Sequence, residues 1–524
     1  MTDVPRWTAH ELTFESERTR EHPFWDVDLT VELTAPSGRT FTIDGFWDGG
    51  QTWRARLRLD EIGEWRWRTV ASDADDAGLH DQSGALTCVP YEGPNAVYRH
   101  GPVQVAGDGH TLAHADGTSF LWLGDTVWNG LIRANDADWG DYLCTRRAQG
   151  FSVIQFFSTH WRGLATDPEG QAAYTEDGRF TVNPRFYQRL DPKVAAIADH
   201  GLLASAIVVL SLYDEEPGWA WPAAQLIRFA RWLRARWGAY HIAWSFGGDG
   251  DFSGERAERW KPIGAAVYSK PPEALVTMHP FGWSWVGDEF RDQPWVTFFV
   301  YQSGHSAEEP KVRWLPEGPH VSDWLQRPAR PIINVEPNYE DHPSYGSGVR
   351  FTATEVRRAS YWSLLITPPA GVTYGHFSLW AWASEHEPVG DAIRRQSEYT
   401  LEPWWSVLAT PGAESMTILR RYFESGDWRT LRPAQDLLSE QPGDDDARRF
   451  IAVAQTVGGD WTAAYLPVGG TIQLHTSAAT DRSARWFDPR NGHWLAAEPA
   501  TATAERLLFT APSDGDWVLD LRRR

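Results

Sequence analysis

The chain is poor in cysteine and methionine, and it has no long apolar run. Only 2 cysteines and 3 methionines occur among 524 residues. Cys88 and Cys144 are too few for a disulfide framework or a four-cysteine zinc site. No stretch approaches the roughly 18 apolar residues of a membrane-spanning helix. The first residues, Met1 to Trp7, have neither the basic nor the apolar part of a secretory signal. We therefore expect a cytoplasmic protein without a membrane partner.

Basic residues are also scarce relative to acidic ones. Lys and Arg total 49 against 70 Asp and Glu, which gives a net charge of −21. A field of that sign repels nucleic-acid phosphates and anionic lipid surfaces, so neither is expected as a partner. Hydrophobic residues make up 42% of the chain, the usual value for globular protein. At about 150 residues per domain, this length predicts roughly three domains.

Tryptophan is the abundant residue, with 31 copies beside 16 Tyr and 23 Phe. Packing in large β-sheet and barrel cores accounts for most of them. Aromatic faces also stack on the apolar faces of sugar rings, leaving the hydroxyl groups to polar side chains. The excess therefore favours a protein that handles carbohydrate over one that handles nucleotides.

The sequence patterns at the two ends of the chain predict all-β domains. Residues 1–105 contain runs that alternate apolar and polar positions, such as 29–34, 53–59 and 65–70. Residues 431–524 contain similar runs at 450–454, 461–466 and 517–521. Short strands with period-two alternation, separated by turn residues, are typical of β-sandwiches. We predict one sandwich at each end.

Residues 106–430 alternate between strand and helix. We expect a helix that begins at an Asp191 cap and ends before Gly201, and another from Ala223 to Trp237. The pattern predicts eight strands, the number in a closed (β/α)8 barrel. A doubly wound open sheet is the alternative, but no glycine-rich phosphate loop follows the first strand. The eight predicted strands are 120–124, 153–157, 202–212, 242–246, 275–278, 295–300, 332–335 and 372–376.

Active sites of such barrels lie at the carboxyl ends of the strands. The residues that follow the predicted strands are carboxylates, imidazoles and aromatics, with almost no Lys or Arg. Such a set suits a neutral polyol better than a phosphorylated substrate. The substrate-binding candidates are Asp125, Trp128, His160, Tyr213, His279, Tyr301, Gln302, Tyr339, His376 and Trp380. Asp125 has a second interpretation, as a cap for the following helix.

Asp249 and Glu336 are the candidate catalytic pair. Glycoside hydrolysis needs one carboxylic acid to protonate the leaving oxygen and one carboxylate to attack or to activate water. A carboxylate at the end of an apolar strand, as at Glu336, is costly unless it is paired or functional. Asp249 could instead serve the turn geometry of its Gly-Gly-Asp-Gly-Asp segment, and Asp251 is an alternative acid. The separation of the two carboxyl groups decides between retention and inversion, and the sequence does not supply it.

Other chemistries have little support. The segment from Asp249 to Gly254 begins like a calcium loop, but Trp260 stands where the bidentate Glu belongs. No zinc-protease motif accompanies the histidines, and no Gly-x-Ser-x-Gly elbow occurs. We therefore predict no metal and no cofactor.

Two segments of the barrel region resemble a known family. They are 120–128, Phe-Leu-Trp-Leu-Gly-Asp-Thr-Val-Trp, and 142–155, which ends in Gly-Phe-Ser-Val-Ile-Gln. Both resemble the opening of apiosidase-like (DUF4038) glycoside hydrolase barrels. The resemblance implies that Asp249 is the acid/base and Glu336 the nucleophile of a retaining enzyme.

The flanking segments support the same resemblance. His22-Pro-Phe-Trp-Asp and Phe46-Trp-Asp-Gly-Gly are similar to the DUF5060 β-sandwich that precedes such barrels. The segment 484–492, Ala-Arg-Trp-Phe-Asp-Pro-Arg-Asn-Gly, resembles the collagen-binding-like sandwich that follows them.

The sequence thus predicts a retaining, exo-acting glycoside hydrolase that removes a terminal sugar from a small glycoside or oligosaccharide. The resemblance implies a furanoside such as β-D-apiose or arabinofuranose. The alternative is a non-catalytic carbohydrate-binding protein on a barrel scaffold, in which both carboxylates would be dispensable. A lyase or isomerase would require a Lys base or a metal site that the sequence does not offer. The sugar, its linkage and the oligomeric state stay open.

Overall fold

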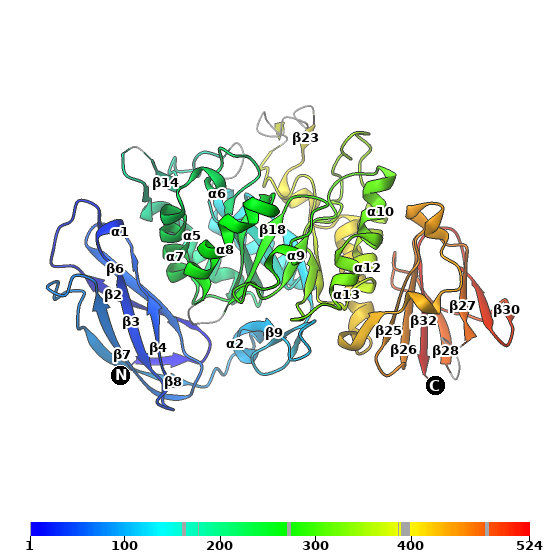
Figure 1. Cartoon of the computed structure of the whole chain (residues 1–524), viewed down its shortest axis with the longest axis horizontal. Coiled ribbons are helices and arrows are strands. Elements are labelled where there is room, and N and C mark those ends of the chain that lie inside the picture. The colour runs from blue at the N-terminus through cyan, green and yellow to red at the C-terminus, as the bar shows by residue number, and fades with distance from the viewer. Residues whose placement is uncertain are drawn as a thin grey trace.

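A computed structural model describes residues 2–159, 164–176, 178–269, 274–385, 387–388, 399–476 and 482–523. The chain forms a central α/β part with a β-rich part at either side (Figure 1). The N-terminal part lies at one side and the C-terminal part at the other. Among the described residues, no helix has the length and apolar character needed to cross a bilayer.

The central part is built on an eight-stranded parallel sheet, ordered β18-β17-β16-β13-β12-β21-β20-β19. The strands at the two ends of this order, β18 and β19, also approach each other. The backbone N–H of Thr297, just before β19, donates to the carbonyl of Val276 on β18 at 2.9 Å, and this bond closes the sheet. The prediction of a (β/α)8 barrel is therefore confirmed. The strands are β12 (Trp122–Thr126), β13 (Val153–Phe157), β16 (Leu203–Leu210), β17 (Ile242–Gly250), β18 (Leu275–Pro280), β19 (Phe299–Tyr301), β20 (Ile332–Asn334) and β21 (Gly371–Tyr374).

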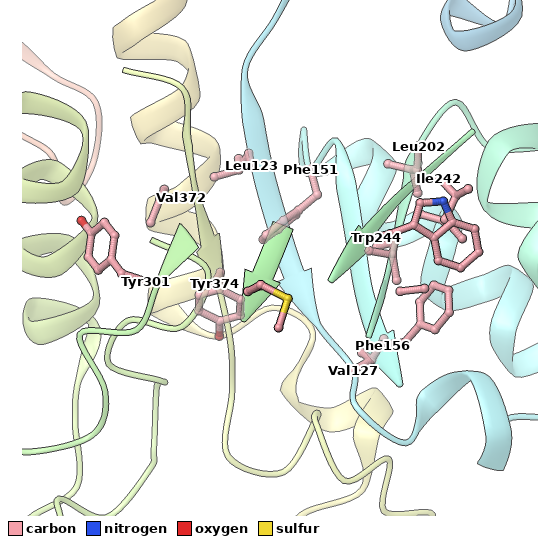
Figure 2. Close-up of a cluster of buried hydrophobic side chains, with 14 of the residues drawn as sticks. Leu123, Val127, Phe151, Phe156, Leu202, Ile242, Trp244, Tyr301, Val372 and Tyr374 are labelled. Atoms are coloured by element: carbon pink, nitrogen blue, oxygen red, sulfur yellow. The ribbon is translucent and has the colours of Figure 1, made fainter. Parts of the chain in front are cut away.

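Successive side chains of these strands point alternately into the barrel and toward the helices. Trp122, Val153 and Leu203 belong to the inner core, whereas Leu123 and Ile154 belong to the large cluster shared with the helices. Figure 2 shows part of that large cluster, including Leu123. A small sheet of β9 (Val103–Val105), β10 (Leu112–His114) and β11 (Ser119–Phe120) contributes to the inner core as well. Because this sheet covers the amino ends of the strands, access to the barrel is left at the carboxyl ends.

Helices surround the barrel. They are α3 (Gly130–Arg133), α4 (Asp136–Ala148), α5 (Pro184–Asp199), α6 (Pro217–Ala220), α7 (Ala223–Trp237), α8 (Gly254–Tyr268), α9 (Gly287–Phe290), α10 (Glu309–Glu317), α11 (His320–Asp323), α12 (Ala353–Leu365) and α13 (Pro411–Glu424). Two short pairs, β14 (Tyr174–Thr175) with β15 (Thr181–Val182) and β22 (Glu387–Pro388) with β23 (Thr400–Leu401), extend from the loops.

The helix expected from Asp191 begins earlier than predicted. Helix α5 starts at Pro184, and the Asn183 side chain caps it by accepting from the backbone N–H of Arg185 at 3.1 Å. Asp191 lies inside the helix, where its carboxylate serves an ion-pair cluster rather than a cap. The predicted helix 223–237 matches α7.

Each flanking part consists of two packed sheets, as predicted. The N-terminal part has β1 (Thr2–Pro5), β8 (Ser83–Val89), β7 (Gly63–Ala71), β3 (Leu29–Thr34) and β4 (Thr40–Asp44) in one sheet, and β2 (Ala9–Glu15), β6 (Thr52–Arg58) and β5 (Phe46–Trp47) in the other. Two short helices, α1 (Pro23–Asp26) and α2 (Ala96–His100), accompany them.

The C-terminal part has the same plan. One sheet contains β24 (Leu431–Pro433), β25 (Ala452–Thr456), β26 (Trp461–Leu466), β32 (Trp517–Arg523), β28 (Arg482–Phe487) and β29 (Trp494–Ala496). The other contains β27 (Thr471–His475), β31 (Arg506–Thr510) and β30 (Thr501–Ala502). Each sandwich buries an apolar core of its own, as alternating strands require.

Buried arginine–carboxylate contacts attach both sandwiches to the barrel. Asp191 on α5 accepts from Arg56 of β6 at 2.6 Å and from both Nε and Nη2 of Arg236 on α7, at 2.8 and 2.7 Å. At the other end, Arg357 on α12 donates two hydrogen bonds to Asp516, at 2.7 and 2.9 Å. These charge-assisted bonds fix each sandwich on a defined helix face.

Replacement of Asp191 tests the N-terminal attachment. Asp191→Ala leaves two buried arginines without their shared carboxylate, so we expect the free energy of unfolding to fall by about 3–5 kcal/mol. Urea denaturation measures the change. Glu64→Gln is the control, because the Arg66–Glu64 pair is exposed and such pairs contribute at most about 1 kcal/mol. Equal losses in the two variants would contradict the role of Asp191.

Candidate active site

Asp249 lies near the carboxyl end of β17, at an irregularity of the strand. The register between β17 and β18 shifts between Ser245 and Gly248 and again before Gly250. Asp249 itself has φ of +56°, the left-handed region that residues with a side chain rarely adopt. A bulge of this kind re-aims a side chain at the end of a strand. Here the Asp249 carboxylate faces the neighbouring strands β18 and β19.

The flanking glycines make this conformation possible. A Cβ at Gly248 would lie 2.5 Å from Ile207, and one at Gly250 would lie 2.2 Å from the ring of Phe252. Neither neighbour is free to move, because both side chains are buried. The Gly-Gly-Asp-Gly motif therefore has a steric origin, and the carboxylate that it presents is the one polar side chain of the segment 246–250.

Glu336 follows β20 and is held by two imidazoles. Nε2 of His305 lies 3.0 Å from Glu336 Oε1, and Nε2 of His279 lies 3.6 Å from Oε2. The backbone N–H of Tyr339 points at Nδ1 of His305 at 3.5 Å, so the proton of His305 is placed on Nε2. His305 therefore donates to Glu336, which keeps that carboxylate oxygen in one position.

His279 lies between the two carboxylates. Its Nδ1 is 3.8 Å from Asp249 Oδ1, whereas its Nε2 faces Glu336. Gln302 Nε2 donates to Asp249 Oδ1 and to the carbonyl of Pro280, and it lies 3.2 Å from His279 Nδ1. The carboxyl ends of β17, β18, β19 and β20 are thus joined by one polar network.

The two carboxylates are close together. One oxygen of each, together with one nitrogen of His279, lie within 4.8 Å of one another. Three such groups could hold a metal ion. A metal ion takes one nitrogen from an imidazole, whereas here the carboxylates face different nitrogens of His279. The arrangement therefore fits an imidazole between two acids better than a metal centre.

Several predicted aromatic residues reach this network. The ring of Trp128 meets that of His279 edge-on, with centroids 5.8 Å apart. The ring of Tyr339 lies 4.5 Å from that of His305, and its hydroxyl donates to Thr126. Trp380 is buried in the same apolar cluster as Trp128 and Tyr339. Aromatic rings thus contact both imidazoles of the network.

Two of the predicted substrate-binding residues point away from the barrel interior. Asp125 is fully buried, and its Oδ2 accepts from Tyr142 at 2.7 Å and from Arg146 at 2.6 Å on α4. Its neighbours Gly124 and Thr126 occupy the inward positions of β12, so Asp125 points toward the helices. Its side chain does not cap the next helix either, because α3 has Asn129 at its N-cap.

Tyr301 also points away from the barrel interior, because side chains alternate between the two faces of its strand. It packs on the outside of the barrel, with its ring 4.1 Å from that of His320 (Figure 2). The inward position belongs to Gln302, one residue later. A shift of one residue along a strand moves a side chain to the opposite face.

The remaining candidates lie apart from the pair or outside the described residues. Tyr213 is exposed at the end of β16, and His376 uses Nδ1 to accept from the backbone N–H of Ser378. His160 lies outside the described residues. Oδ1 of Asp251 accepts from the Ser253 hydroxyl at 2.6 Å, beside the start of α8.

The sequence analysis missed His305, although it contacts Glu336 directly. It lies four residues beyond β19, in the loop that leads to α10, and only the first residues after each strand were considered. The segment Gln302-Ser-Gly-His305 could have indicated this residue, because a turn at its glycine can bring the chain back to the barrel opening. Gly304, with φ of +67°, provides that turn.

The comparisons with known proteins agree on all three parts. Residues 106–430 match the family described as "Apiosidase-like, catalytic domain". Residues 3–72 match the domain of unknown function DUF5060, and residues 432–522 match the family described as "Putative collagen-binding domain of a collagenase". No curated protein matches the chain.

Two solved structures from Bacteroides vulgatus share the fold. One is a glycoside hydrolase of family 5, 21% identical, with a TM-score of 0.69, over 81% of this chain and 93% of its own. The other is named as a "putative glycoside hydrolase"; it is 19% identical, with a TM-score of 0.73, over 100% of both chains. At this identity the likeness establishes the arrangement of the three parts.

Burial keeps three histidines of the barrel neutral. It lowers the pKa of His305, His320 and His376 to about 3. In the unfolded chain the same side chains bind protons below about pH 6.5. Between these values the unfolded state binds more protons, so the free energy of unfolding decreases as the pH falls.

Urea denaturation at pH 7 and pH 5 tests this linkage. We expect a lower stability at pH 5, by up to about 2 kcal/mol for each of the three histidines. His320→Gln should reduce the loss, because Gln can donate to the Leu315 carbonyl as His320 does but does not titrate. An identical pH dependence in wild type and variant would show that His320 is not held neutral.

Proposed function

This chain belongs to the family of apiosidase-like catalytic domains and is a glycoside hydrolase, and we propose that it removes a terminal sugar with retention of configuration. The observation that carries the proposal is the approach of Asp249 and Glu336 within 4.8 Å, with His279 between them. Retaining enzymes hold their carboxyl groups about 5–5.5 Å apart, and inverting ones leave about 6.5–9.5 Å for a water. The short separation supports a direct attack by one carboxylate.

Glu336 is the nucleophile in this proposal. It is ionised, accepts from a neutral His305, and attacks the anomeric carbon while the bond to the leaving oxygen breaks. Asp249 protonates that oxygen as it departs. Because Gln302 donates to Oδ1 of Asp249, the transferable proton is assigned to Oδ2. In the second step Asp249 takes a proton from water, which attacks the anomeric carbon and releases Glu336.

The surroundings of the pair support action on a single terminal sugar. Glu336 is 8% exposed, and the neighbouring rings of Trp128 and Trp380 are 4% and 5% exposed. Both rings belong to one apolar cluster with Phe157 and Tyr339, and the rings of Trp128 and Tyr339 contact those of His279 and His305. An enclosed carboxylate beside aromatic rings accommodates one sugar unit more readily than a polymer crossing the barrel. A furanoside such as apiose or arabinofuranose fits family membership.

The catalytic pair is tested with a panel of apiosides, arabinofuranosides, xylosides and rhamnosides. Glu336→Gln and Asp249→Asn should each lower kcat by about 10³-fold or more on the sugar that wild type cleaves. Proton NMR of the first product should show the anomer of the substrate. Asp251→Asn is the matched control and should retain activity, and dialysis against a chelator should not reduce it. Wild-type inversion would contradict the nucleophile role, and sugar binding without hydrolysis would favour a carbohydrate-binding protein.

His305 is a positioning residue for Glu336. His305→Ala removes a hydrogen bond to the carboxylate, so we expect kcat to fall by about 10–100-fold with KM little changed. Because that bond stabilises the ionised form, its loss should raise the pKa of Glu336 and move the acidic limb of the pH–kcat profile to higher pH. His305→Gln, which can still donate, should restore part of both effects. A loss of kcat that is the same at every pH, with an unshifted pH–kcat profile, would indicate a purely structural role.

A further inference from the structure

An open hollow of about 470 Å³ lies where the N-terminal sandwich meets the barrel. Residues from the segments 19–25 and 47–51 of the sandwich line it, together with Arg179 and Thr181 of the barrel. Arg179 and Thr181 belong to the connection from β13 to α5, which starts at the carboxyl end of its strand (Figure 1). The hollow therefore lies on the side of the barrel opening, and its lining includes neither Asp249 nor Glu336.

Trp47 offers an aromatic surface to this hollow. Its side chain is half-buried, and within the described part of the chain its ring stacks on no other aromatic ring and on no cation. Its Nε1 donates to the Gly50 carbonyl at 3.0 Å, so the polar atom of the indole is satisfied. The Trp47 carbonyl accepts from Trp232 Nε1 on α7 at 2.9 Å, and the next residue, Asp48, accepts from Arg236 at 2.7 Å. The barrel thus holds this part of the sandwich, and with it the indole, in one position.

Trp25 places a hydrogen-bond donor in the same lining. The guanidinium of Arg179 lies 4.8 Å from the centroid of the Trp25 ring, and its Nη1 lies 3.7 Å from Asp26 Oδ1. Trp25 Nε1 donates to the Phe180 carbonyl at 2.6 Å, which ties the sandwich to the barrel loop that carries Arg179. Arg179 donates no hydrogen bond to another described residue, so its N–H groups remain available to a ligand.

Gln51 adds an acceptor. Its Nε2 donates to the Ser16 carbonyl at 3.0 Å, which orients the amide, and its Oε1 accepts from no described residue. The two arginines of the lining are both paired: Arg20 lies 2.7 Å from Asp73, and Arg179 has its own carboxylate at 3.7 Å. The hollow therefore combines an aromatic surface, a donor and an acceptor without an unpaired cation. Such a set suits a neutral ligand better than an anion.

We propose that this hollow binds one ring of a neutral oligosaccharide, as a second carbohydrate site apart from the proposed catalytic pair. A sugar ring has an apolar face that stacks on an indole, and its hydroxyl groups need both donors and acceptors. Trp47 meets the first requirement, and Arg179 and Gln51 meet the second. Because the hollow lies on the side of the barrel opening, a chain bound there is kept near the proposed active site. The binding itself does not depend on the catalytic carboxylates.

Native electrophoresis of the full chain in gels that contain arabinan, xylan or β-glucan tests the site. We expect at least one of these neutral polysaccharides to retard the wild-type protein. Trp47→Ala should raise the Kd for that polysaccharide by about tenfold or more, because a tryptophan contact contributes strongly to binding. Trp405→Ala is the matched control: this indole is 53% exposed and lies outside the hollow, so the variant should bind as wild type does. Unretarded wild type in all three gels would overturn the proposal.

Exposed residues of the lining give a test that does not rest on the folding of Trp47→Ala. Arg179→Ala and Gln51→Ala remove exposed side chains, and each should raise the Kd by about 3–10-fold through one lost hydrogen bond. Glu336→Gln should be retarded as strongly as wild type, so the failure of this site and the failure of the proposed hydrolase activity are distinguishable. Retardation that is lost in Glu336→Gln but kept in the Trp47, Arg179 and Gln51 variants would place binding in the barrel and overturn the proposal. Retardation by the anionic carboxymethylcellulose alone would contradict the neutral ligand.

Discussion

The alternation of side chains along parallel strands controls which residues of this protein meet. In a closed barrel each strand offers every second residue to the interior, and the residue just beyond its carboxyl end continues that pattern. His279 and Gln302 occupy such positions on neighbouring strands and lie 3.2 Å apart, whereas Glu336 follows the inner-core residue Val335 and is held by His305. Asp249 requires an exception, because β17 is bulged and its glycines allow the left-handed conformation that turns the carboxylate toward β18.

The neutral imidazole of His305 gives the network its chemical character. His279 and His305 are almost fully buried, and burial lowers the pKa of His305 to about 3. A neutral imidazole can donate to Glu336 without pairing with it as a full charge, so the carboxylate stays oriented and remains available for attack. A lysine or arginine in the same place would stabilise the ground state of the carboxylate more strongly and would lower its nucleophilicity. The proposed mechanism therefore depends on burial as much as on residue type.

Arginine performs a different task in the same molecule. Arg56 and Arg236 meet at Asp191, and Arg357 meets Asp516, so that each sandwich is fixed to a helix of the barrel by a shared carboxylate. Helix α12 thus attaches the C-terminal sandwich to the barrel.

The amino-acid sequence by itself determined the architecture, because period-two and helical patterns are local and the eight strands and both sandwiches could be read from them. It also determined Asp249 and Glu336 as candidates, since each follows a strand whose end lies at the barrel opening. Tertiary structure decided the rest. Whether Asp125 and Tyr301 face the interior depends on the register of each strand, and the role of Asp191 inside α5 depends on Arg56, 135 residues away, to which its carboxylate is paired. The contact of His305 with Glu336 spans a loop whose return path is set by Gly304. Such long-range pairings have no local signal, because they arise only when separate strands and helices pack together.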